Sequence, residues 1–92
     1  MNHESAEILA LKALSYVVGD EAALRTLLTQ TGLTGEEMRS AAGTREFQAG
    51  VLDFLTRHED HLIAFCESEE LKPDSLVRAH GLLTGNSIES IR

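Results

Sequence analysis

The sequence is poor in the residues on which several structural classes depend. It has one Cys, one Pro and no Trp among 92 residues, and aromatic residues make up 4% of the chain. A single Cys excludes a disulfide within the chain, so a hydrophobic core has to hold the fold. The scarcity of Pro, with 42% hydrophobic and 25% charged residues, is typical of one folded soluble domain rather than a disordered segment.

Lys and Arg are scarce as well. Eight basic residues stand against 15 acidic ones, and the formal net charge of −7 is spread over both halves of the chain. Proteins that bind a phosphate backbone need clustered Lys and Arg to displace counterions. The charge therefore argues against nucleic acid as a partner.

The sequence also lacks a long apolar run. The run from Ile8 to Val18 is interrupted by Lys12 and is shorter than the roughly 20 residues that a membrane-spanning helix needs. Residues 1–5 contain an acidic residue and no Lys or Arg, which is the reverse of a secretory signal. We therefore expect a cytoplasmic protein with a free thiol and no membrane partner.

The segment from Arg45 to Cys66 holds all three Phe residues and predicts a helical hairpin. Thr44 is placed to cap its first helix, and a tight turn capped by His58 or Asp60 should join the two helices. The apolar face of the first helix has to be covered by other helices, because each large side chain buried is worth roughly 1.5–3 kcal/mol. That face consists of Phe47, Val51, Leu52, Phe54 and Leu55.

Three further helices are expected before this hairpin. Asp20 is placed to cap the second of them, and Thr34 with Glu37 forms a capping box at the start of the third. The predicted helices cover about 5–18, 21–31 and 34–43, with stops at Gly19, Gly32 and Gly43. The apolar face of the first helix consists of Leu9, Ala13, Leu14, Tyr16 and Val17.

The apolar pattern recurs when the chain is compared with itself at an offset of 38 residues. Leu9 then falls over Phe47, and Val17 over Leu55. The sequence predicts an all-α, compact single-domain bundle of about six helices, built from two tandem three-helix repeats of about 38 residues. The domain would span 1–81, with repeat units at about 5–43 and 44–81, and 82–92 would form a flexible or loosely docked tail.

His58, His61 and Cys66 are the candidates for a metal site. The two histidines could share a helix face, but Cys66 falls at a core position, and zinc would need four ligands at about 2.0–2.3 Å. Cys66 is also a poor nucleophile, because the glutamates that follow it disfavour the thiolate. We predict no cofactor and no metal, and we keep a small-ligand or metal-responsive regulator using these three residues as the alternative function.

No nucleophile–base pair, phosphate-binding glycine loop or dinucleotide fingerprint is present, so we predict that the protein is not an enzyme. The leading hypothesis is a protein–protein interaction module with an unknown protein partner and an oligomeric state left open. Residues 59–74 contain six acidic residues and one Lys, which suits either a solvated face or an acidic patch for a basic partner. The patch candidates are Glu59, Asp60, Glu67, Glu69, Glu70 and Asp74.

Gly50 lies inside a predicted helix, where glycine costs about 1 kcal/mol relative to Ala. Close approach of another helix, or of a partner helix, would explain it. The stretch Gly50-Val51-Leu52-Asp53-Phe54-Leu55, with His58-Glu59 after it, resembles a family of short alphaproteobacterial proteins, Domain of Unknown Function 3572. The resemblance covers about Glu7 to Gly81 and implies a bacterial cytoplasmic protein. It brings no assigned activity, so it marks Gly50, Asp53 and His58-Glu59 only as targets for mutation.

Overall fold

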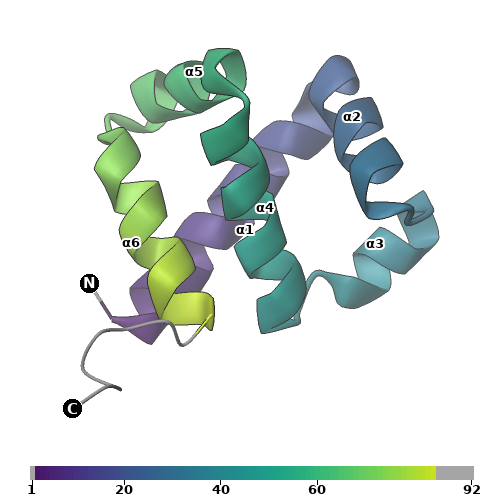
Figure 1. Ribbon diagram of the computed structural model, residues 1–92, viewed down its shortest axis with the longest axis horizontal. Coiled ribbons are helices and arrows are strands. Elements are labelled where there is room, and N and C mark those ends of the chain that lie inside the picture. The colour runs from purple at the N-terminus through teal and green to yellow at the C-terminus, as the bar shows by residue number, and fades with distance from the viewer. Residues whose placement is uncertain (1, 85–92) are drawn as a thin grey trace.

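The computed structural model describes residues 2–84 (Figure 1). Within these residues the chain forms helices and no strands, so the all-α prediction is confirmed. The six helices are α1 (His3–Gly19), α2 (Glu21–Thr31), α3 (Gly35–Ala41), α4 (Arg45–Arg57), α5 (Glu59–Glu69) and α6 (Pro73–Thr84).

Side-chain caps start four of the helices. The Asp20 carboxylate accepts the Ala23 N–H at 3.0 Å, and the Thr44 hydroxyl accepts the Phe47 N–H at 3.2 Å. The capping box of Thr34 and Glu37 at the start of α3 is also present. These predicted caps are confirmed. The first helix begins two residues earlier than expected, because Asn2 caps it by accepting the Ser5 N–H at 2.8 Å.

Two helix ends differ from the prediction, which had a stop at Gly43 and a domain bound at residue 81. The helix α3 ends at Ala41, before Gly43, and α6 continues through Gly81 to Thr84. Continuation of α6 buries Leu83, which is 4% exposed, and burying a Leu outweighs the cost of about 1 kcal/mol for a helical glycine. Residues 82–84 of the predicted tail thus belong to α6, and 85–92 lie outside the described residues.

The centre of the molecule is formed by α1, α4 and α6, each of which packs against the other two. Figure 1 shows α4 crossing in front of α1, with α6 alongside. The predicted apolar face of α4 is buried throughout, and it supplies more of the core than any other helix. The predicted apolar face of α1 also lies in or against this core. The largest side chains that are almost completely buried are Phe65, Leu27, Leu52, Leu55, Leu76, Val17 and Val51.

The two halves of the chain differ in their third helices. The helix α6 packs against α4, α1 and α5, whereas none of the residues of α3, all of which are described, is buried. In Figure 1 the pair α2 and α3 lies on one side of α4 and the pair α5 and α6 on the other. The long helices α1 and α4 pack together. The tandem repeat itself stays a prediction.

Candidate functional site

The His58 side chain has a structural role at the corner between α4 and α5. Its ring Nδ1 lies 2.8 Å from the Phe54 carbonyl oxygen, which can only accept, so Nδ1 carries the hydrogen. The ring also lies against Phe54 with a centroid distance of 4.3 Å. His58 thus closes the end of α4, and its side chain accepts no hydrogen bond from the backbone N–H groups at the start of α5. The predicted side-chain cap at this corner is present at the end of α4, where His58 forms it. The first turn of α5 has no side-chain cap.

His61 and Cys66 point to different surroundings. Nδ1 of His61 lies 3.1 Å from the Tyr16 hydroxyl, and its ring makes an edge contact with Tyr16. Cys66 is 4% exposed in the core, and burial raises the pKa of its thiol. Residues 2–84 contain no group of three or more His, Cys, Asp or Glu side chains that could hold a metal ion. His58 and His61 line an open hollow of about 300 Å³, but Cys66 does not, so the three residues of the alternative regulator do not form one site.

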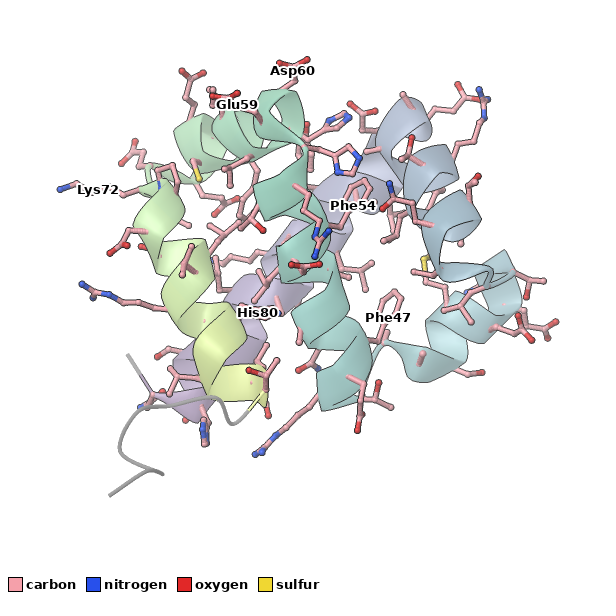
Figure 2. All side chains as sticks on the ribbon, viewed as in Figure 1. Phe47, Phe54, Glu59, Asp60, Lys72 and His80 are labelled. Carbon is pink, nitrogen blue, oxygen red and sulfur yellow. The ribbon has the colours of Figure 1, made fainter. Side chains whose placement is uncertain are left out.

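The predicted acidic patch is split between the two ends of α5, a helix of 11 residues and about 16 Å. Glu59 and Asp60 lie in its first turn, and Figure 2 shows both at the edge of the molecule. Glu67 and Glu69 lie at the opposite end, followed by Glu70. Negative charge stabilises a helix N-terminus and destabilises a C-terminus. Helix stability therefore explains Glu59 and Asp60 but does not explain the acidic residues at the C-terminal end of α5.

Asp74, the last member of the patch, lies in the first turn of α6. Its carboxylate is 3.4 Å from the guanidinium of Arg78, one helical turn further on. Both side chains are about 70% exposed, so the pair contributes little, in the range of about 0–1 kcal/mol. Asp74 thus also has a local structural role.

Gly50 lines an open hollow of about 500 Å³ between α4 and α6, together with Asp53 and His80. A Cβ atom added at Gly50 would meet no atom of the described residues within 4 Å. Close approach of a helix of this chain therefore does not explain Gly50. Asp53 pairs with Arg57 at 2.8 Å, one turn along α4, which satisfies its charge locally.

Gln48 is a buried polar residue that the sequence analysis did not single out. It is 6% exposed, and its Nε2 donates to the Ala42 carbonyl oxygen at 3.2 Å, fastening the turn between α3 and α4. Its Oε1 has no hydrogen-bond partner among the described residues. The apolar positions around it in the sequence give no signal for such a tether.

The outer face of α1 is the largest feature that the sequence analysis missed. Ile8, Leu11 and Val18 are 48%, 47% and 49% exposed, although the inner face of the same helix is buried in the core. With Ser15 these residues have spacings of three, four and three, which place them in one stripe along a helix. The spacing was visible in the sequence, but it was obscured by the apolar residues of the inner face that alternate with it.

A groove adjoins this stripe on the side of α5 and α6. It consists of two hollows of about 250 and 260 Å³, both lined by Lys12 and Glu69. The first has an apolar lining of Ile8, Leu9 and Leu71, and the second is lined by polar groups that include the Tyr16 hydroxyl. Lys12 and Glu69 lie 3.7 Å apart where the two hollows meet, so an exposed ion pair spans the groove.

No helix of the described residues is long and apolar enough to cross a membrane.

Among the comparisons with known proteins, only the one with family models gives a match. Residues 3–86 match the model of one protein family, described as a protein of unknown function, DUF3572. The match covers nearly the whole chain and contains the stretch from Gly50 to Leu55. No curated protein and no solved structure matches the chain.

Proposed function

The chain belongs to the DUF3572 family of proteins of unknown function, and we propose that this member is a non-enzymatic protein–protein interaction module. The observation that carries the proposal is the uncovered apolar stripe of α1, formed by Ile8, Leu11 and Val18. Single exposed apolar residues are common on protein surfaces, but several in one stripe mark interaction sites.

The two-sided character of α1 strengthens this interpretation. A helix that is apolar all round is normally buried all round. The inner face of α1 is covered by α4 and α6, while the three large residues of the stripe remain about half exposed. Complete burial of each is worth roughly 1.5–3 kcal/mol, so covering the exposed half of the three releases about 2–4 kcal/mol toward binding.

The chemistry of the described residues supports a binding role over a catalytic one. Cys66, the strongest potential nucleophile, is buried, and its raised pKa keeps it as the thiol. His58 and His61 hold structural contacts with the Phe54 carbonyl oxygen and the Tyr16 hydroxyl.

Affinity capture with matched variants tests this function. The tagged protein, its Leu11→Glu variant and its Val77→Glu variant are used to recover partners from the cells that produce it. Val77 is a suitable control because it is an exposed apolar residue, 58% exposed, on α6. Both substitutions add one negative charge at an exposed position of a helix whose other face is buried.

We expect a near-stoichiometric partner with the wild type and with Val77→Glu, and its loss with Leu11→Glu. Light scattering of the same three proteins identifies the case in which the partner is a second copy of the chain. Equal recovery with both variants would contradict the role of the stripe. A wild-type protein that stays monomeric at high concentration and recovers nothing above background would contradict the proposed function.

A further inference from the structure

The groove between α1 and the C-terminal end of α5 has an apolar floor. Its first hollow, of about 250 Å³, is lined by Ile8, Leu9 and Leu71 and is open at the surface. An enclosed cavity of about 150 Å³ lined by Leu, Ile and Phe binds benzene. The hollow therefore has room for one aliphatic or aromatic side chain of a partner. Ile8 belongs both to this hollow and to the stripe of α1, so the two form one continuous surface.

The rim of the groove carries a negative charge at Glu69, which lines both hollows. In the sequence Glu69 has acidic neighbours, Glu67 in the same last turn of α5 and Glu70 directly after the helix, and this turn holds no basic residue. The carbonyl groups of the helix terminus add their own partial negative charge. An isolated helix would be more stable with Lys or Arg at these positions.

The backbone at this end is also held in a form that disfavours Glu. Leu71 N–H donates to the Cys66 carbonyl oxygen at 2.8 Å, and Glu70 N–H to that of Glu67 at 3.3 Å, which is a Schellman motif. Glu70 has φ +57°, in the left-handed region. The corresponding residue at the end of α2 is Gly32, with φ +73°. An acidic side chain is thus present at Glu70 in spite of the local conformation.

Few cations neutralise this rim. Lys12 lies 3.7 Å from Glu69, and the two side chains are 57% and 34% exposed, so water screens the pair and it is worth at most about 1 kcal/mol. Lys72 follows α5, and Figure 2 shows its side chain extending outward from the edge of the molecule. A cation supplied by a partner therefore meets little competition at Glu69 and Glu70.

We propose that the stripe and the groove together bind a basic amphipathic helix of a partner protein. Its apolar side chains cover Ile8, Leu11 and the hollow, and its Lys or Arg side chains lie over Glu69 and Glu70. The stripe from Ile8 to Val18 is about 15 Å long, which is the length of three helical turns. This inference rests on the proposed function and names the chemistry of the partner.

Two synthetic peptides test the inference directly. Each is a helical peptide of four turns with the same Leu stripe at the spacing of Ile8, Leu11, Ser15 and Val18. One has Lys and Arg beside the stripe, and the other has Glu at the same positions. Binding of each labelled peptide to the full chain is measured by fluorescence anisotropy at low and moderate salt. We expect the basic peptide to bind at least about tenfold more tightly at low salt, and the difference to shrink as salt screens the charges.

Paired charge variants locate the binding. Glu69→Gln combined with Glu70→Gln removes two charges from the C-terminal end of α5, and Glu59→Gln combined with Asp60→Asn removes two from its first turn. We expect the first variant to weaken binding of the basic peptide by at least about fivefold and the second to change it by less than about twofold. The control has the same net charge, so it separates a local contact from general attraction between a basic peptide and an acidic protein.

The outcomes separate this inference from the proposed function. Equal weakening by the two charge variants would show general electrostatic attraction and would overturn the groove as the site. Equal affinity of the acidic and the basic peptide, lost with Leu11→Glu, would overturn the basic partner while leaving the interaction module intact. Failure of both peptides to bind overturns the inference, and the proposed function falls with it only if the capture experiment also finds no Leu11-dependent partner.

Discussion

The two faces of α1 (His3–Gly19) differ in their exposure. One is packed in the core, and we propose that the other binds a partner. The inner face combines the small residues Ala6, Ala10 and Ala13, at 0–1% exposure, with the larger Leu9 and Val17, which are also buried. The outer face has the large side chains of Ile8 and Leu11, each about half exposed. An ordinary amphipathic helix has its large apolar residues inside, because burial of area is what stabilises it. In α1 large apolar residues lie on both faces, so packing in the core accounts for the inner face, and we propose that a partner accounts for the outer one.

The largest expected effect comes from charging the inner face. Ala13→Asp places a carboxylate against a core in which Ala13 is 0% exposed. A buried, unpaired charge of this kind costs several kcal/mol, so we expect a loss of more than about 4 kcal/mol or complete unfolding. Urea titration followed by circular dichroism measures it. A fully helical Ala13→Asp protein with unchanged midpoint would contradict the assignment of the two faces.

Enlarging the inner face should have a smaller effect. Ala10→Leu adds volume where Ala10 is 1% exposed, and overpacking of this kind destabilises by about 1–3 kcal/mol. The reverse change on the outer face, Leu11→Ala, is the matched control and should stay within about 0.5 kcal/mol. The two urea midpoints sharpen the comparison, because both substitutions are between the same two residue types on one helix. Similar losses from the two variants would show that the outer face is also part of the core.

The protein should gain stability when Glu70, which follows the C-terminal end of α5, is replaced by Gly. Glu70→Gly introduces at φ +57° the residue that Gly32 provides at the end of α2, and it relieves a conformation that costs a non-glycine residue about 1 kcal/mol. We expect the free energy of unfolding to rise by about 0.5–1 kcal/mol. Affinity for the basic peptide should fall in the same variant. A lower stability would contradict the view that Glu70 is kept for binding at the expense of the fold.

The smallest effect on stability is expected from charging the outer face. Leu11→Glu should change the free energy of unfolding by no more than about 0.5 kcal/mol, because Leu11 is 47% exposed and surface substitutions usually fall in this range. Its effect on partner binding should be the largest of the four variants that remain folded. Thermal unfolding of wild type and variant at one concentration checks the first statement. A clearly lower melting temperature would show that lost binding reports damage to the fold.

Local signals in the sequence predicted much of the fold. The caps at Asp20, Thr34 and Thr44 depend on residues within three positions of each other, so no tertiary information was needed. The buried face of α4 followed from its spacing in the same way. The continuation of α6 past Gly81 could not be predicted, since it depends on burial of Leu83 in a core assembled from other helices.

The role of the acidic residues stays a prediction. The sequence already placed Asp60 at the corner before α5 and the glutamates after Cys66, and the helix bounds agree with that placement. The exposed stripe of α1 was hidden because a helix with apolar residues on both faces does not show which of them faces the core. The choice between its faces is made by α4 and α6, which cover Ala6, Ala10 and Ala13.

Photo-crosslinking in living cells tests the outer face of α1 most directly. A photoreactive phenylalanine analogue replaces Leu11 in one strain and Val77 in another, and crosslinked products are compared after illumination. Our account predicts one defined crosslinked species from position 11 and none from position 77. No product from position 11, or the same products from both positions, would contradict the claim that this face of α1 binds a partner.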